Sequence, residues 1–100
     1  MTVRLSPSAL NDLDDILSHT WRAFGEDQAL RYKQGLDATL DVLDQAPRIA
    51  RERLDVDPPV RLHPYRRHVI VYRIIDDGIL VVRLLHARQD WLSALYSEED

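Results

Sequence analysis

The chain has 100 residues, of which 45% are hydrophobic and 30% are charged, and it contains no cysteine. This length and composition predict a single folded domain with a modest core, and they exclude a disordered chain, disulfides and cysteine-based zinc sites. The formal net charge of −4 argues against a general nucleic-acid coat protein. Uninterrupted apolar runs such as Ile79–Val82 are too short to span a membrane. The first residues lack the apolar core of a signal peptide, so we expect a cytoplasmic protein.

The first half of the chain predicts a short strand followed by a helical hairpin. The strand covers residues 2–5, and Ser6-Pro7 is typical of a helix start, with serine as the N-cap and proline at the first helical position. Apolar residues then recur at helical spacing as far as Gly25, which closes the helix, and a second helix ends at Pro47. Because almost no linker separates the two helices, residues 7–46 are expected to fold back as an antiparallel hairpin.

Two pairs of side chains in the first helix have a structural interpretation. We interpret Trp21 and Phe24 as core residues, because large aromatic side chains dominate the energetics of protein cores. Asp12 and Asp15 lie near the start of the helix, where its dipole favours negative charge, and we interpret both as solvated. A small sheet is nevertheless expected to leave part of the hairpin's apolar surface uncovered, so that a partner helix can lie there.

The second half of the chain predicts strands. Residues 48–60 are interpreted as a connecting loop, with a helical turn within Ile49–Leu54. Strands are expected at residues 60–65, 68–75 and 79–86, and a last helical turn at Trp91–Tyr96. These elements predict an α+β domain in which the helical hairpin packs on a small antiparallel sheet.

The register of the last two strands follows from their alternating apolar residues. If both apolar faces cover one core, facing residue numbers sum to an even number, as with Tyr72 opposite Val82, and the loop has three residues, 76–78. The opposite face then carries Val71, Arg73, Val81 and Arg83, with the two arginines side by side, and is predicted to be a binding surface. The expected core consists of Leu13, Leu17, Leu36, Leu40, Ile70, Tyr72, Val82 and Leu84.

The basic residues are concentrated in the second half of the chain. Residues 61–89 carry six arginines and two acids, so this stretch is positive in an acidic protein. It either presents a basic face to an acidic partner or forms a solvated strand face that balances the acidic helical half. Arginine, tyrosine and histidine together can also stabilise charge and move a proton at an RNA phosphate. His63 and His68 are poorly spaced for a metal, and no phosphate loop or nucleophile elbow is present, so we expect no cofactor.

The order and spacing of several motifs resemble the ParE branch of the RelE/ParE toxin superfamily. These motifs are Leu5-Ser6-Pro7, the run from Asp12 to Ile16, Phe24-Gly25-Glu26, Gln28-Ala29, Ala46-Pro47-Arg48, the run from His68 to Arg73, and the run from Leu84 to Asp90. The resemblance covers nearly the whole chain. It implies a β-α-α-β-β-β arrangement, which the pattern of elements also predicts.

The resemblance also implies a function. ParE toxins inhibit DNA gyrase and are neutralised by a cognate antitoxin, usually with a DNA-binding N-terminal domain and a C-terminal toxin-binding segment. The expected complex is a hetero-oligomer that meets operator DNA only through the antitoxin. Two alternatives stay open. One is a ribosome-dependent messenger-RNA endoribonuclease of RelE type, and the other is a toxin fold that has lost its activity and only binds its partner.

The candidate site residues divide into two sets, and no catalytic residue or metal ligand is assigned. For antitoxin binding we expect apolar side chains of the hairpin and arginines of the strands, namely Leu10, Leu17, Trp21, Arg61, Arg67, Arg73 and Arg83. For the toxic interaction with the target we expect the C-terminal basic strip, namely Arg83, His86, Arg88 and Trp91.

Overall fold

The computed structural model describes residues 2–96; Met1 and residues 97–100 lie outside the described part. Its elements are β1 (Thr2–Leu5), α1 (Pro7–Phe24), α2 (Glu26–Gln45), β2 (Glu52–Arg53), β3 (Val60–Tyr65), β4 (His68–Ile75), β5 (Gly78–His86) and α3 (Trp91–Tyr96). The predicted β-α-α-β-β-β order and the last helical turn at Trp91–Tyr96 are confirmed, and β2 is an additional strand. The helical turn predicted within Ile49–Leu54 is wrong, because this segment instead contributes β2, which pairs with β3.

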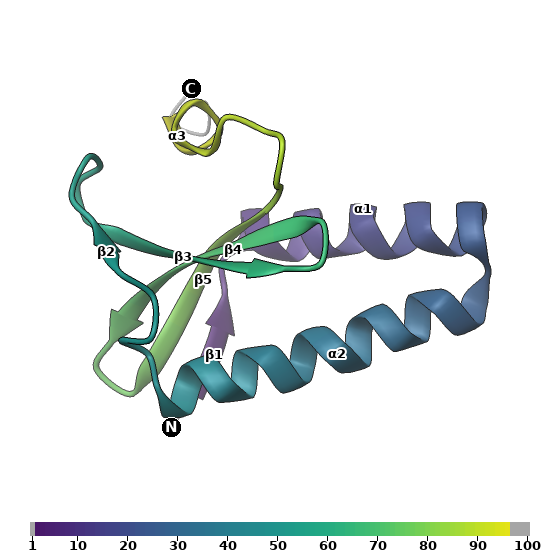
Figure 1. Ribbon diagram of the computed structural model, residues 1–100, viewed down its shortest axis with the longest axis horizontal. Helices are drawn as coiled ribbons and strands as arrows, with labels where there is room; N and C mark the ends of the chain where they lie inside the picture. The colour runs from purple at the N-terminus through teal and green to yellow at the C-terminus, as the bar shows by residue number, and fades with distance from the viewer. Residues whose placement is uncertain (1, 97–100) are drawn as a thin grey trace.

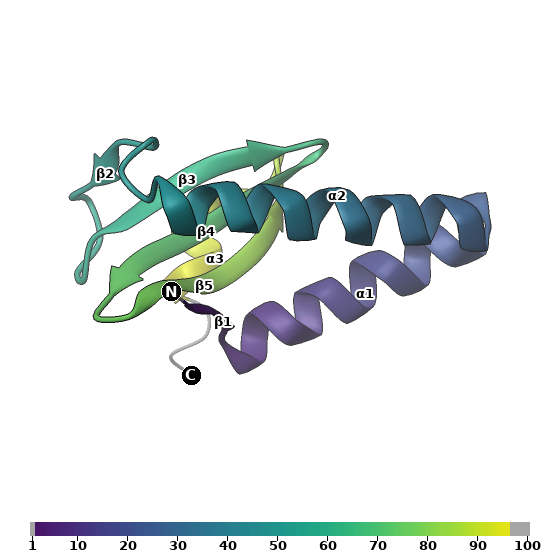
Figure 2. The same cartoon turned by 90° about the horizontal axis from the view of Figure 1, so that it is seen from below.

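The molecule has three layers. The five strands form one sheet in the order β1-β5-β4-β3-β2, with the α1–α2 hairpin on one face and α3 on the other (Figure 1). Both views show the end of the hairpin where α1 meets α2 reaching well beyond the sheet (Figure 2). The sheet is mixed rather than wholly antiparallel, because β1 pairs in parallel with β5.

The hairpin starts and turns where the sequence predicts. The Ser6 hydroxyl accepts a hydrogen bond from the Ala9 amide at 3.0 Å and donates one to the Val82 carbonyl at 2.7 Å, so the N-cap also fastens α1 to β5. Gly25 has a φ of 95°, which glycine adopts without strain, and its amide donates to the Trp21 carbonyl at 2.8 Å. This local geometry sets the close antiparallel packing of α1 and α2.

The main core lies between the hairpin and the sheet. The expected residues Leu36, Leu40, Ile70, Tyr72 and Leu84 are buried there, with Leu13 and Leu17 packed at its margin. A second core lies on the opposite face, where Ala94 of α3 and its neighbours cover Val71 and Leu85. The sheet is therefore buried on both faces over its centre, and the side chains of β4 and β5 are apolar on both sides.

The predicted hairpin register is correct only in part. At the far end from the turn, Ile70 faces Leu84 and the residue numbers sum to the expected even value. Near the turn, Ile75 faces Gly78 across a two-residue loop, and Tyr72 faces Val81. An irregularity between these two stretches inserts Val82 as an extra residue, so Val82 joins the second core and Val81 takes its place under the hairpin.

The bulge also separates the two arginines that were expected side by side. Arg73 faces Leu80, whereas Arg83 faces Val71. The prediction that Val71 and Val81 belong to an open binding face is likewise wrong, since both are fully buried. A parity argument cannot anticipate this result, because one inserted residue moves every later side chain to the other face.

Candidate functional site

A strip of apolar side chains runs along the exposed side of α1. Leu10, Leu17, Trp21 and Phe24 are spaced by seven, four and three residues, which places them on one face of a helix. Leu17 packs at the margin of the main core, but Leu10 is 54% exposed, Trp21 61% and Phe24 71%. The interpretation of Trp21 and Phe24 as core residues is therefore wrong. They belong to the last turns of α1, and the end of the hairpin where α1 meets α2 overhangs the sheet (Figure 2).

Arg83 lies in an internal ion pair. Its Nε and Nη2 donate to the Asp12 carboxylate at 2.6 and 2.9 Å, and the side chains are only 15% and 16% exposed. The same carboxylate accepts the Leu84 amide at 3.0 Å, and Nη1 of Arg83 donates to the Ala94 carbonyl at 3.2 Å. Asp12 is thus not solvated as predicted. The pair joins α1, β5 and α3, and it uses most of the guanidinium's donors within the protein.

Arg61 and Arg73 lie together at the opposite end of the sheet from the β3–β4 turn. Both line a shallow hollow with Glu52. Arg61 is mostly buried and donates to the Ala50 carbonyl at 2.7 Å, so it holds the loop after α2 in place. Their separation from Arg67 and Arg83 means that the four arginines assigned to the antitoxin do not form one patch.

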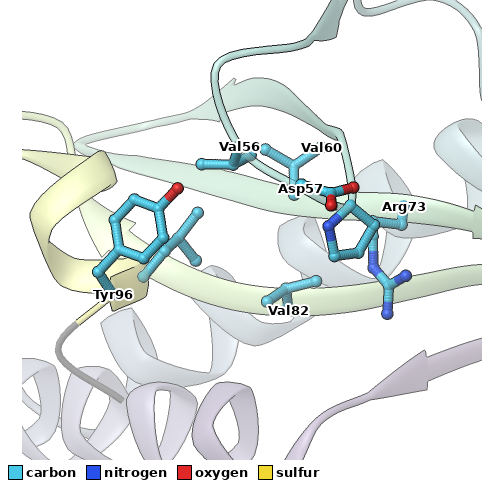
Figure 3. Close-up of a pocket in the computed structure, with 8 residues that line it drawn as sticks. Val56, Asp57, Val60, Arg73, Val82 and Tyr96 are labelled. Carbon is cyan, nitrogen blue, oxygen red and sulfur yellow. The ribbon is translucent and has the colours of Figure 1, made fainter. Parts of the chain in front are cut away.

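Arg73 also borders a pocket between α3 and the loop before β3. Figure 3 shows Tyr96 at one end of this pocket and Arg73 with Asp57 at the other, with valines between them. The pocket has a volume of about 180 Å³. This is small against the roughly 300–1,000 Å³ of a typical ligand site.

A third group of polar residues gathers where β4 begins and β5 ends. We call Arg66, Arg67, His68, His86 and Arg88 the sheet-end cluster. His68 and His86 face each other across the two strands, with ring centroids 5.6 Å apart at an interplanar angle of 76°. The Ala87 amide donates to the Arg67 carbonyl at 2.8 Å and so ties the β3–β4 turn to the segment after β5.

Tyrosines from α2 and β3 support this cluster through hydrogen bonds. The Tyr32 hydroxyl and Nδ1 of His68 are 3.2 Å apart, and the Tyr65 hydroxyl donates to the Tyr32 carbonyl at 2.8 Å. Arg66 Nε in turn donates to the Tyr65 hydroxyl at 3.2 Å. Gly35 leaves the room that the Tyr65 hydroxyl needs, because a Cβ at this position would overlap it. The support therefore connects α2 to the arginines of the turn.

Burial and mutual proximity set the protonation of these groups. Burial, and then the neighbouring His86, lower the pKa of His68, so this ring is held neutral at neutral pH. Burial raises the pKa of Tyr32 well above its usual value, so its hydroxyl keeps the proton. Nδ1 of His86 accepts the Arg88 amide at 3.1 Å.

The structure thus brings together three of the predicted site residues: Arg67, His86 and Arg88. Trp91, predicted as an exposed aromatic of the same strip, is half-buried in the second core, with the Arg53 guanidinium 5.0 Å from its ring centroid. Sequence reasoning did not place His68 beside His86, although the even-sum register already made them partners. It also missed Tyr32 and Tyr65, whose helical or strand spacing gives no sign of polar contacts.

Two kinds of site are absent from the described part of the chain. Residues 2–96 contain no group of three or more histidine, cysteine, aspartate or glutamate side chains placed to hold a metal ion. Nor does any helix within these residues combine the length and apolar character needed to cross a membrane.

Known proteins resemble this chain over most of its length. The family model described as the ParE toxin of the type II toxin–antitoxin system parDE matches residues 3–91. Toxin ParE1 of Mycobacterium tuberculosis (strain H37Rv) is 36% identical over 87 residues, which cover 86% of this chain and 89% of that protein. Toxin ParE1 of Caulobacter vibrioides is 30% identical over 83 residues, with 83% and 85% covered.

A solved structure shares the fold. It is described as the chromosomal ParDE TA system from P. aeruginosa, and it superposes with a TM-score of 0.72 over 86% of this chain and 95% of that chain. The sequences are 24% identical, so this likeness concerns the arrangement of helices and strands.

Proposed function

The chain belongs to the ParE toxin family of type II toxin–antitoxin systems, and on this premise we propose that it inhibits DNA gyrase by binding and is neutralised by direct contact with a cognate antitoxin. The antitoxin is expected to be ParD-like, with a DNA-binding N-terminal domain and a C-terminal segment that covers the toxin. The observation that carries the antitoxin half of this proposal is the apolar strip of α1.

The strip has the properties of a docking surface for an amphipathic helix. Leu10, Trp21 and Phe24 remain exposed on a hairpin whose core is complete without them. Contiguous exposed apolar side chains on a folded domain mark interaction sites, and tryptophan is the side chain most enriched among binding hot spots. An apolar helix face laid along α1 would cover all three, as in other helix-in-groove complexes.

A binding experiment tests the antitoxin contact. Trp21→Ala is expected to weaken the purified antitoxin complex by at least about 2 kcal/mol, roughly 30-fold in Kd, because a central aromatic anchor is lost. Calorimetric titration of toxin with antitoxin measures this change. Val42→Ala is the matched control, since Val42 is an exposed apolar residue of α2 outside the strip. Equal affinities for both variants and the wild type would show that the antitoxin binds elsewhere.

The gyrase half of the proposal rests on the sheet-end cluster. Of the four residues assigned to the target, Arg83 and Trp91 are engaged within the fold, whereas His86 and Arg88 are exposed beside Arg67. We therefore assign the target contact to His86 and Arg88. Residues that only bind lose activity in graded steps, whereas catalytic residues lose about 10²–10⁴-fold when removed.

One observation favours the endoribonuclease as a second candidate. His68 and His86 lie edge to face beside arginines, and histidine can move a proton while arginine stabilises the charge of a phosphate. Purified toxin, freed of antitoxin, decides between the two functions. Inhibition of gyrase supercoiling, weakened in part by His86→Ala and Arg88→Ala but not by His19→Ala or Arg48→Ala, supports the gyrase inhibitor. Cleavage of ribosome-bound message that His86→Ala abolishes would identify the endoribonuclease instead.

A further inference from the structure

We propose that the sheet-end cluster binds the phosphates of a DNA backbone, so that the toxin touches DNA as well as gyrase. The inference rests on the proposed function, because it names the ligand class for the surface that faces the target. It is carried by three observations on the described residues: the arginines without an acidic partner, the histidine donor at His86 and the absence of exposed apolar anchors around them.

The arginines of the cluster have no acidic partner among residues 2–96. Arg66, Arg67 and Arg88 are exposed, and none of the ion pairs found within residues 2–96 includes them. The acids of the β4–β5 turn lie at the other end of the strands, where Asp77 pairs with Arg4. Arg66 and Arg67 lie in the turn that is hydrogen-bonded to the segment carrying Arg88, so three arginines without an acidic partner among the described residues are available to bind an external anion.

The turn that carries two of these arginines is built at a cost in stability. Tyr65 pairs with His68, so Arg66 and Arg67 are the two central residues of a tight hairpin. Arg66 has a φ of 54°, in the left-handed region where glycine or asparagine is preferred in such turns. A strained arginine at the exposed tip of a turn is an observation that points to a functional side chain.

A hydrogen bond at Nδ1 makes His86 a donor at Nε2. The Arg88 amide donates to Nδ1 of His86 at 3.1 Å, so the neutral ring carries its proton on Nε2. This Nε2 has no hydrogen-bond partner among the described residues, so the ring offers an N–H to an anion without having to be charged. His68 lies beside it, 3.2 Å from the Tyr32 hydroxyl through Nδ1.

The surroundings favour a phosphate backbone over an acidic peptide. The large exposed hydrophobic residues are found on the hairpin, in the segment between α2 and β3, and at positions Ile74 and Tyr96. None of them belongs to the cluster. A peptide that binds tightly needs such anchors, whereas backbone phosphates are held by arginine and other polar donors alone. Neighbouring strands are about 4.8 Å apart, so a cluster over three strand ends spans roughly 10 Å. A DNA strand places about three charges along that length of its axis.

The test is the binding of a fluorescent duplex of random sequence by full-length toxin in the absence of gyrase, followed by anisotropy across a salt series. Three neutralised phosphates predict a slope of log K against log salt near −2.7, which is about a 20-fold loss of affinity between 50 and 150 mM salt. Arg66→Gln/Arg67→Gln should reduce the steepness of this slope by about 1.8. Arg48→Gln/Arg51→Gln removes the same charge from exposed positions in the loop after α2 and should leave the slope unchanged.

Three outcomes would overturn the inference. In the first, the wild type does not bind DNA at low salt. In the second, both double variants lose DNA affinity equally. In the third, Arg66→Gln/Arg67→Gln loses affinity for the antitoxin while its DNA binding stays intact. The last would identify an acidic-peptide site. Arg88→Gln serves as a second probe if the turn variant has a lowered melting temperature.

A parallel supercoiling assay separates this inference from the proposed function. If the wild type does not inhibit gyrase but the two double variants still differ in DNA binding, only the proposed function fails. If gyrase is inhibited and both double variants bind DNA like the wild type, only the phosphate site fails.

Discussion

Replacing Asp12 by alanine should destabilise the protein more than any other single change on the surface of α1. The carboxylate accepts three hydrogen bonds, two from Arg83 at 2.6 and 2.9 Å and one from the Leu84 amide at 3.0 Å. Asp12→Ala leaves a guanidinium that is mostly buried without its counter-charge and an amide without its acceptor. Breaking a buried pair in this way costs about 3–5 kcal/mol. Since both side chains retain some exposure, we expect about 3 kcal/mol.

Urea and thermal unfolding measure this loss. For a domain of this size, about 3 kcal/mol corresponds to a fall in Tm of roughly 12–24 °C. Asp15→Ala is the matched control, because Asp15 is an exposed carboxylate on the same helix and its removal should change stability by less than about 0.5 kcal/mol. Asp12→Leu combined with Arg83→Met should recover much of the loss, since no charge is then left buried.

A loss below about 1 kcal/mol in Asp12→Ala would refute the reasoning, because that is the value of a solvent-exposed pair. The outcome also decides how toxicity data on Arg83 are interpreted. If Arg83 acts by holding the fold, Arg83→Ala and Asp12→Ala should lower toxicity in parallel with stability. Replacement of a contact residue such as His86 by alanine should instead lower toxicity while the Tm stays at the wild-type value.

Two further predictions concern stability. Gly78→Ala should cost more than about 2 kcal/mol in urea unfolding, because a Cβ there would overlap the Thr2 backbone and separate β1 from β5; a variant as stable as the wild type would contradict the close approach. The lowered pKa of His68 means that the unfolded chain binds the proton more readily, so stability should be complete above about pH 6.5 and fall as the pH drops below that value. Asp12, Tyr32 and His86 face this ring, and a His68→Gln variant should lose much of the pH dependence in unfolding curves recorded from pH 5 to 8, whereas an unchanged slope would assign it to other groups.

The sequence by itself determined the elements that depend on local signals. The Ser6-Pro7 start, the Gly25 turn and the helical spacing of the leucines specify the hairpin, since capping and backbone preferences act within a few residues. The β-branched runs specify β4 and β5, and the order and spacing of motifs along the chain identified the family. The spacing of α1 puts its large apolar residues on one face. It does not show which of them the sheet covers, because that depends on how far the hairpin reaches past the sheet.

Only the tertiary structure decided the rest. The extra residue at Val82 moves the later side chains of β5 to the other face. The local sequence does not predict this bulge, because the packing of the two cores sets it. The same packing buries Asp12 with Arg83 and packs Trp91 against the second core. Arg83 and Trp91, both expected to contact the target, are therefore engaged within the fold. The sheet-end cluster joins the β3–β4 turn and the start of β4 to the end of β5, and its two histidines are 18 positions apart. Their proximity is a property of strand pairing over distance, which no short stretch of sequence encodes.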